Sequence, residues 1–510
     1  MTQCRTCRGI GGLLVLAGLW SAGGLVHAGQ NESPLPIGTL RRVHSSILKE
    51  DRTLSIHVPS DYGLTRLSYP VLYLLYGDQT EGYFAETVFA LERLAGGAEI
   101  PDCIVVGVHN TDRYGNLLPV HFSGRPSGAD AFLEFLEKEL VPFIESEYRT
   151  KPYRLLVGPQ AGGPFGLYAL ARRPALFKAF ILENPFSAPD SRDVLRKGLR
   201  DYAAGHPEAK AVVAINAFDR TGFQDHSGAN QVLADFLKEF DPVKPAGLRM
   251  WRRQLEEPTF VPSLELKQPL RKIFEGFSPP AGTEMRGLAD ILAYYRETGR
   301  RFGFEVDPPP FLLSVKADDL LRAGRTDAAR EVLEYALSLR PDETNASFRL
   351  GNLLFEAGDL DRAEAVFRKL QERRPDPFFK QRLEAVKRMR NHSAAHALSK
   401  ALEEGLPAAR ARLAGLETSK EAETYFDERE FNALGYRLLG RDRIDQAVFI
   451  LELNARRHPD SWNAHDSLGE AYMKAGRTRD AVRSYERSLG LNPANANAKK
   501  MLEALKRLTS

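Results

Sequence analysis

Cysteine is scarce in this chain of 510 residues, which contains three. Cys4 and Cys7 form a C-x-x-C close to the N-terminus, and Cys103 stands in the apolar run 103–108. A lone cysteine in such a run is typically a small buried apolar side chain. If the N-terminal segment is removed, no internal disulfide is expected, and a redox function for the C-x-x-C pair is not indicated.

The chain also lacks an excess of one charge, a long apolar run and a metal-binding motif. Its 70 basic and 67 acidic residues give a net charge of +3, which argues against nucleic acid or an anionic membrane as the main partner. Beyond the N-terminal segment, no stretch approaches the ~20 apolar residues of a membrane span. Zinc-finger, H-E-x-x-H, P-loop and dinucleotide patterns are absent from the sequence, so no metal or cofactor is predicted.

The N-terminus has the pattern of a signal peptide. Arg5 and Arg8 precede a short apolar run over residues 12–20, and Val26 and Ala28 supply small residues for cleavage after Ala28. We therefore predict a signal peptide over residues 1–28 and export to the periplasm or the medium. An uncleaved N-terminal anchor is the alternative.

Strand-like and helix-like patterns alternate over residues 29–285. Continuous apolar runs of this kind are typical of parallel strands buried on both faces of a sheet. Helical patterns lie between them, as at residues 129–148 and 165–173, and predict a helix-covered, mostly parallel sheet. The runs are residues 71–75, 104–108, 154–157, 179–182 and 211–215.

The rest of the chain is nearly all helical in pattern. We assign residues 286–309 to a linker, because Pro308-Pro-Pro310 cannot continue a helix. A period of 34 residues follows, with small residues that allow close helix packing and prolines that end helices. The pairs that carry it are Gly435 and Gly469, Ala447 and Ala481, Pro459 and Pro493, Ala329 and Ala363, and Pro341 and Pro375.

These markers resemble the tetratricopeptide repeat (TPR) family over residues 310–375 and 428–508, the latter ending in a capping helix. Residues 376–427 are interpreted as a helical spacer or a degenerate repeat. The resemblance implies an all-α solenoid whose concave face binds a protein or peptide. Several arginines of the repeats suit acidic peptide ends, although solvated helix faces explain them equally well: Arg322, Arg325, Arg349, Arg477 and Arg483.

A catalytic motif lacks its nucleophile. The run 154–157 leads into Gly158-Pro-Gln160-Ala161-Gly162, and a helical pattern follows. This is the spacing of the nucleophile elbow G-x-S-x-G, in which a strained turn presents a serine. Gln160 occupies the serine position. Taken alone, the motif also fits an ordinary strand-to-helix turn.

Other segments resemble the esterase D-like serine esterases of the α/β-hydrolase fold, over residues 40–280. They are residues 71–78, 110–113 with Pro119, the elbow, and 174–177. The resemblance implies an elbow serine and a late histidine base, but Pro258 stands at the matching late position. No histidine occurs from Gly228 through Asn391, and Asp219 is the matching acid with no imidazole to orient.

We therefore predict an exported esterase-like pseudoenzyme with TPR repeats, because a carboxamide cannot be activated as a nucleophile. A small ester or carboxylate ligand is a further hypothesis, held by Gln160, the Ala161 N–H and a backbone N–H near Gly77 and Asp78. The alternative is an active carboxylic-ester or acyl hydrolase with a non-standard nucleophile. Ser187 and His226 are the candidates for that chemistry. A purely structural scaffold is a third interpretation.

Overall fold

The computed structural model describes residues 37–78, 82–221, 224–225, 227–255, 265–418 and 424–509. The predicted signal peptide, His226 and Pro258 lie outside these ranges. From Gly38 onward the chain forms one compact unit. Within the described ranges, no helix is both long and apolar enough to span a membrane.

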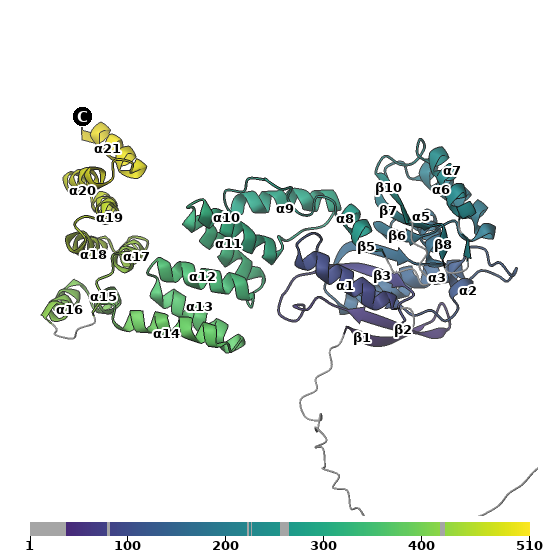
Figure 1. Ribbon diagram of the computed structural model, residues 1–510, viewed down its shortest axis with the longest axis horizontal. Helices are drawn as coiled ribbons and strands as arrows, with labels where there is room; N and C mark the ends of the chain where they lie inside the picture. Colours follow the sequence, from purple (N-terminus) through teal and green to yellow (C-terminus); the bar gives the residue numbers. More distant parts are fainter. Residues whose placement is uncertain are drawn as a thin grey trace, which may run out of the picture. The chain divides into compact units, whose positions relative to one another are not determined.

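A twisted sheet of eight strands forms the centre of the first domain (Figure 1). Its strands are β1 (Thr39–Ser45), β2 (Glu50–His57), β3 (Tyr69–Leu75), β4 (Ile104–Val108), β5 (Thr150–Gly158), β6 (Ala179–Glu183), β7 (Ala211–Phe218) and β10 (Leu248–Leu255). They lie in the order β1-β2-β4-β3-β5-β6-β7-β10. Strands β4, β3, β5, β6, β7 and β10 run parallel, and β1 and β2 are antiparallel additions at one edge. A separate two-stranded ribbon joins β8 (Arg220–Thr221) and β9 (Gln224–Asp225).

The five strands expected from apolar runs are all present, and the predicted α/β-hydrolase fold is confirmed. The sequence did not predict β1, β2 or β10. Strands β1 and β10 form the two edges of the sheet, and their side chains are mostly exposed or half-buried. Because an edge strand needs no continuous apolar run, these segments carry polar residues that hide their β-structure.

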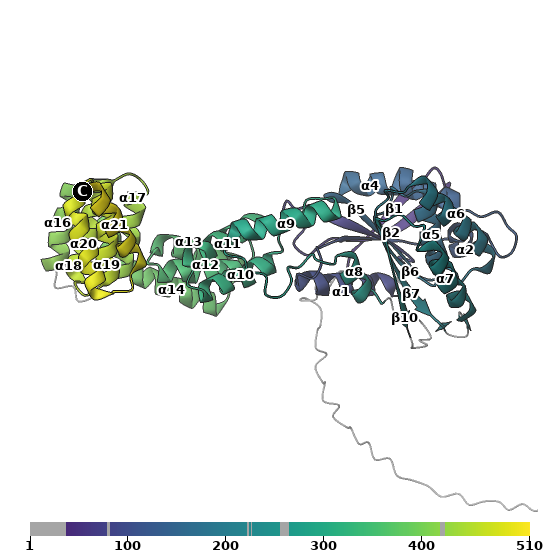
Figure 2. The same ribbon diagram turned by 90° about the horizontal axis from the view of Figure 1, so that it is seen from above.

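Helices cover both faces of this sheet. Helices α1 and α8 lie together on one face, and α5, α6 and α7 lie on the other (Figure 2). The helix predicted over residues 129–148 consists of α3 and α4 joined by a π-helical turn. The helices are α1 (Tyr83–Gly96), α2 (Arg113–Leu117), α3 (Ala129–Phe135), α4 (Val141–Glu147), α5 (Gly162–Arg172), α6 (Arg192–Gly205), α7 (Ser227–Phe240) and α8 (Lys267–Ile273).

The segment assigned to a linker, residues 286–309, contains the 15-residue helix α9 (Leu288–Phe302). Its aromatic side chains pack on the sheet domain: the Phe302 ring lies 6.2 Å from that of Tyr153, and Tyr295 lies 5.8 Å from Phe277. Helix α9 also contacts the first repeat. The segment therefore packs against both neighbours instead of separating them, and its prolines mark only the start of the next helix.

Twelve helices follow α9 in the described residues. They are α10 (Pro310–Arg322), α11 (Thr326–Leu339), α12 (Thr344–Glu356), α13 (Leu360–Arg373), α14 (Pro377–Asn391), α15 (Ala394–Glu403), α16 (Leu406–Thr418), α17 (Glu428–Leu439), α18 (Ile444–Arg457), α19 (Trp462–Lys474), α20 (Thr478–Leu491) and α21 (Ala496–Thr509). The helices pack on each other in successive pairs, as the predicted solenoid requires: α10 with α11, α12 with α13, α15 with α16, α17 with α18 and α19 with α20. The predicted spacer, residues 376–427, contributes α14, which packs on α13, and the pair α15 and α16.

Close helix contact explains why glycine recurs in the repeats. A Cβ atom on Gly351, Gly435 or Gly469 would lie within 2.8 Å of a side chain 16 residues further along, on the second helix of the same repeat. These partner side chains are Phe367, Leu451 and Tyr485. A larger residue in the first helix would push the pair apart, so the 34-residue period reports direct packing.

Candidate functional site

The carboxyl ends of four strands lie together at one end of the sheet. Strands β3, β5, β6 and β7 are parallel neighbours, so their carboxyl ends meet there. In open α/β sheets, ligands bind in the crevice outside these ends. The site residues expected from the sequence lie here: Gly77 and Asp78 after β3, Gln160 and Ala161 after β5, and Asp219 after β7.

The turn after β5 has the geometry of an elbow. Gln160 adopts a φ of +48°, which is a strained backbone conformation for a residue other than glycine. Close backbone contacts require glycine at positions 158 and 163. A Cβ on Gly158 would lie 2.2 Å from the Gly162 carbonyl oxygen, and one on Gly163 would overlap the carbonyl oxygen of Glu183. The predicted strand, tight turn and helix are therefore all present.

The polar groups of Gln160 contact neighbouring side chains. Its backbone N–H donates to Glu183 Oε2 at 3.3 Å, and its side-chain Nε2 donates to the hydroxyl of Tyr83 at 3.1 Å. Glu183 is the last residue of β6, and both it and Tyr83 are buried. The Glu183 carboxylate thus stabilises the strained backbone of the turn, and the Tyr83 hydroxyl holds the Gln160 carboxamide in place.

Two of the backbone N–H groups expected at the ligand site are engaged within the chain. The Ala161 N–H donates to the Tyr76 hydroxyl at 3.3 Å, and the Gly77 N–H donates to the Val108 carbonyl at 2.9 Å. Tyr76 itself has a φ of +70° and is buried. Its phenol oxygen therefore occupies the place beside Ala161 where a substrate oxygen would lie in a hydrolase.

The guanidinium of Arg113 packs over the aromatic ring of Tyr76. The Arg113 guanidinium lies 4.8 Å from the centre of the Tyr76 ring and 3.6 Å from Asp78 Oδ2. A guanidinium over an aromatic face is attracted by the electron density of the ring. The Arg113 contact holds one face of the Tyr76 ring, and the rings of Tyr76 and Tyr83 pack in a T-shaped arrangement with their centroids 6.3 Å apart.

Asp219 lies directly after β7, the position of the acid in the family pattern. Its Oδ1 accepts a hydrogen bond from Asn230 Nδ2 at 3.0 Å, and Asn230 also donates to the Phe218 carbonyl at 2.8 Å. Buried Asn184 donates to the same carbonyl and accepts from the Phe218 N–H at 2.8 Å. Asparagine side chains thus hold the end of β7 and Asp219.

The other candidates have local roles. The Ser187 N–H donates to the Asn184 carbonyl at 2.8 Å, and no histidine among the described residues hydrogen-bonds its hydroxyl. His109 hydrogen-bonds Ser55 at 2.8 Å, and burial lowers the pKa of its imidazole. Cys103 is buried, as predicted, and burial raises the pKa of its thiol. No group of three or more metal-ligating side chains is found in the described ranges.

Sequence reasoning missed Tyr76, Tyr83 and Glu183. Glu183 directly follows the apolar run 179–182, and its position at the end of a predicted strand was a usable signal. Tyr76 likewise follows the run 71–75. Tyr83 offered no such signal, because its hydroxyl reaches Gln160 only through the packing of α1 against the sheet.

The repeats form a second candidate site. An open cavity of about 830 Å³ lies against the first helices of two successive repeats, α10 and α12. Its lining includes Leu321 and Phe348, the amides of Asn345 and Asn352, and the ion pair of Arg349 with Asp318. Apolar surface with a few converging polar groups is typical of ligand sites.

The arginines predicted to receive acidic peptide ends are paired with carboxylates of this chain. Arg322 and Arg483 contact acidic residues three positions earlier in their own helices, and Arg349 pairs with Asp318. Arg477 lies 2.7 Å from Asp480, and Arg325 lies 3.9 Å from Glu284. Each of these arginines therefore already has a carboxylate partner within the chain.

Comparison with known proteins agrees with this architecture. Residues 45–258 match the family described as "Putative esterase". They form an esterase-family domain. Residues 315–377 and 464–499 match tetratricopeptide repeat families, so TPR repeats follow the esterase-family domain.

Two curated proteins of Bacillus subtilis resemble parts of the chain. One is the uncharacterized protein YjcH, 28% identical over 151 residues, which are 29% of this chain and 60% of that protein. The other is the ferri-bacillibactin esterase BesA, 28% identical over 137 residues, or 23% of this chain and 47% of that protein. The chain thus spans about half of the length of these relatives.

Solved structures are also similar. An IroE-like serine hydrolase from Shewanella oneidensis is 25% identical, with a TM-score of 0.49 over 59% of this chain and 99% of that chain. An uncharacterised protein from Capnocytophaga ochracea is 18% identical, with a TM-score of 0.46 over 68% of this chain and 99% of that chain.

Proposed function

We propose that this chain is an esterase-family pseudoenzyme that acts after export by binding a protein or peptide on its TPR repeats. One observation carries the proposal. At the elbow, a carboxamide replaces the nucleophile, and the adjacent Ala161 N–H donates to Tyr76 of the same chain. The hydrogen-bonding groups of Gln160 and Ala161 are therefore paired with side chains of the same chain.

The chemistry of the replacement supports the loss of hydrolysis. A carboxamide carries no proton that a neighbouring base removes near neutral pH, and it is a poor nucleophile. Loss of triad members in a well-studied protease lowers the rate by roughly 10⁴ to 10⁶. An oxyanion donor adds roughly 10² to 10³, and Tyr76 holds that donor here. Turnover close to the uncatalysed rate follows.

Hydrolysis is tested on the full chain with short p-nitrophenyl esters and a fluorophosphonate probe. The natural protein should give no turnover above buffer and no covalent labelling. The variant Gln160→Ser should also remain unlabelled, because a serine alone lacks a base. A secreted serine esterase of established activity serves as the positive control. A saturable rate or a labelled band from the natural protein would refute the proposal.

A second candidate function is hydrolysis of an ester by an unconventional nucleophile. Retention of Asp219 at the end of β7 favours it, as does the resemblance to an esterase named for ferri-bacillibactin. An iron-loaded siderophore ester is therefore the substrate class to include in the assay. Mass spectrometry of the reaction mixture separates the two functions, because binding leaves the ester intact and hydrolysis shortens it.

Partner binding is tested at the cavity on α10 and α12. Asn352 and Phe348 line it, so Asn352→Ala and Phe348→Ala should weaken capture of the partner without changing thermal stability by more than a few degrees. Glu372→Ala, an exposed position on α13 outside the cavity lining, is the matched control. Equal capture by the cavity variants and the control would exclude this surface as the binding site.

A further inference from the structure

Among the residues that the structure describes, the apolar core is interrupted within the repeats. One cluster of buried apolar residues extends from Leu54 to Val386, and a second extends from Ala394 to Leu505. The first includes the esterase-family domain with α10–α14, and the second includes α15–α21. Apolar burial is the dominant stabilising term inside each cluster, but it does not join the two.

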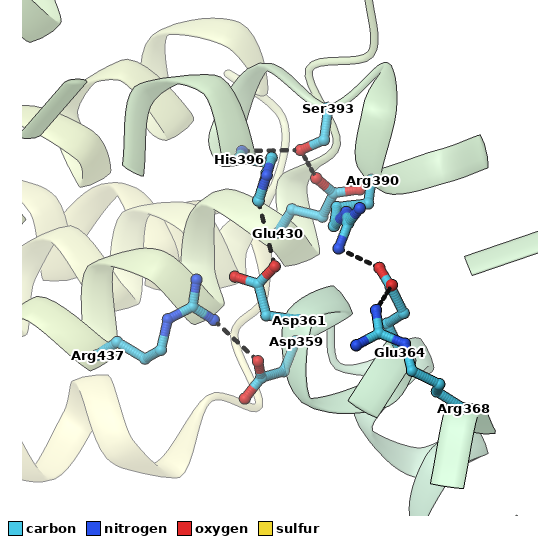
Figure 3. Close-up of polar contacts among 9 residues, drawn as sticks. All are labelled: Asp359, Asp361, Glu364, Arg368, Arg390, Ser393, His396, Glu430 and Arg437. Atoms are coloured by element: carbon cyan, nitrogen blue, oxygen red, sulfur yellow. Dashed lines mark hydrogen bonds and ion pairs between the residues drawn. The ribbon is translucent and has the colours of Figure 1, made fainter. Parts of the chain in front are cut away.

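Polar contacts join the two clusters instead, and we call this region the seam (Figure 3). Asp361 of α13 lies 3.4 Å from His396 Nδ1 of α15. Asp359, which precedes α13, lies 3.3 Å from Arg437 of α17. Contacts of this type each contribute only about 0.5–1 kcal/mol when partly solvated, so these side-chain contacts across the seam are individually weak.

Buried carboxylates occupy the middle of the seam. Glu364 of α13, 2% exposed, pairs with Arg368 and with Arg390 at the end of α14. Glu430 of α17, 3% exposed, accepts a hydrogen bond from the hydroxyl of Ser393. Glu364 thus has two guanidinium partners, whereas Glu430 has a neutral one.

The backbones also meet closely at this point. A Cβ on Gly358, in the turn between α12 and α13, would lie 2.6 Å from the backbone nitrogen of Glu430. Gly358 has a φ of +73°, so a side chain is disfavoured there in any case. The first turn of α17 therefore lies directly on a turn of the preceding repeats, and movement of Glu430 is coupled to separation of the seam.

The groups that surround Glu430 leave its charge poorly compensated. Asp427 of its own helix repels a charged Glu430, and Arg429 and His396 attract it more weakly than burial penalises it. Asp361, Glu364 and Arg390 also lie in the seam (Figure 3). Asp361 pairs with His396, and Glu364 pairs with Arg390. Burial accordingly raises the pKa of Glu430 to about 7.

We propose that the seam is a proton-responsive hinge in which proton uptake by Glu430 closes the contact between α10–α14 and α15–α21. A neutral Glu430 fits the buried position beside Ser393 and the Gly358 turn. A charged Glu430 gains solvation when α17 moves away from that turn. The orientation of the second group of repeats, and with it the continuity of the TPR surface, thus depends on pH.

The direction in which pH shifts the ratio of open to closed seam follows from proton linkage. In the open seam Glu430 regains its ordinary pKa of 4.5, whereas in the closed seam its pKa is about 7. The closed state binds more protons between these values, so the ratio of open to closed seam rises with pH, by up to about tenfold per unit. Below this window, and above it, the ratio is constant.

Distances between spin labels on α13 and α20 measure the hinge in the full chain. Exposed Glu372 and Arg479 are replaced by cysteine for labelling, with Cys4→Ser and Cys7→Ser, while buried Cys103 stays. Between pH 4.5 and 7.5 the distance distribution should shift from one population to another, with the proportion following a single proton.

The decisive variant is Glu430→Gln, which imitates the protonated side chain. It should keep the low-pH distance at every pH, whereas Glu403→Gln, an exposed position on α15, should respond like the natural protein. Gly358→Ala should give the open distance even at low pH. A full pH response in Glu430→Gln would assign the effect to His396 and overturn the proposal, as would a pH-independent distance in the natural protein.

Discussion

Replacement of Arg340 by methionine should destabilise the chain, because this arginine compensates two carboxylates at once. Arg340 follows α11 in the first repeat, and it pairs with Asp61 and, at 2.6 Å, with Asp102 of the esterase-family domain. The three side chains are 22%, 14% and 33% exposed, respectively. Methionine preserves most of the side-chain volume and removes the charge.

The free energy of unfolding lost in Arg340→Met is estimated from two limits. Removal of one partner from a fully buried ion pair costs 3–5 kcal/mol, and loss of an exposed pair costs 0–1 kcal/mol. Because these groups retain some solvent, we expect a loss of about 3 kcal/mol at pH 7.5. With an unfolding entropy of ~2.1 cal/mol/K per residue for ~470 residues, this corresponds to about 3 °C in Tm.

The pH dependence distinguishes charge from packing. Burial raises the pKa of Asp61 and of Asp102, and Arg340 opposes that rise at both. Without Arg340 both pKa values rise further, and a raised carboxyl pKa contributes stability at low pH that is lost as the pH increases. The deficit of Arg340→Met should therefore be largest above neutrality and shrink as the pH falls.

Calorimetry and urea denaturation between pH 5 and 8 measure this deficit. Arg322→Met, which removes an exposed pair on α10, is the matched control and should change stability by less than about 0.5 kcal/mol. Adding Asp102→Asn should restore part of the loss, because it removes one uncompensated charge. A deficit that is equal at pH 5 and pH 8, or no larger than that of the control, would refute the reasoning.

Two further predictions concern the elbow and the repeats. Tyr76→Phe leaves the buried Ala161 N–H without its acceptor and should lower the free energy of unfolding, measured by urea denaturation, by about 1–3 kcal/mol. An unchanged midpoint would mean that another acceptor replaces the phenol. Gly469→Ala places a Cβ 2.8 Å from the Tyr485 ring and should lower the free energy of unfolding by about 1–3 kcal/mol. Gly490→Ala, whose Cβ meets no neighbour, should be neutral or slightly stabilising, and equal melting temperatures for the two variants would contradict the packing explanation.

The local pattern of the site was visible in the sequence, but its partners were not. Gln160 was identified because the spacing of Gly158 and Gly162 specifies the turn irrespective of the residue between them. Tyr76 and Glu183 escaped notice because a hydrogen bond to position 160 or 161 depends on which strands are neighbours. Strand β3 lies beside β5 although β4 comes between them in the chain, whereas β5 and β6 are consecutive.

The sequence by itself determined the class of each domain, because the apolar runs of buried parallel strands and the 34-residue period of the repeats are local patterns of burial and close packing. It also determined that a carboxamide stands at the elbow. Only the tertiary structure decided that Tyr76 takes the Ala161 N–H, that Arg340 joins the repeats to the esterase-family domain, and that polar groups join the two apolar clusters. These contacts link residues far apart in the chain, and their energies depend on burial, which only the folded arrangement creates.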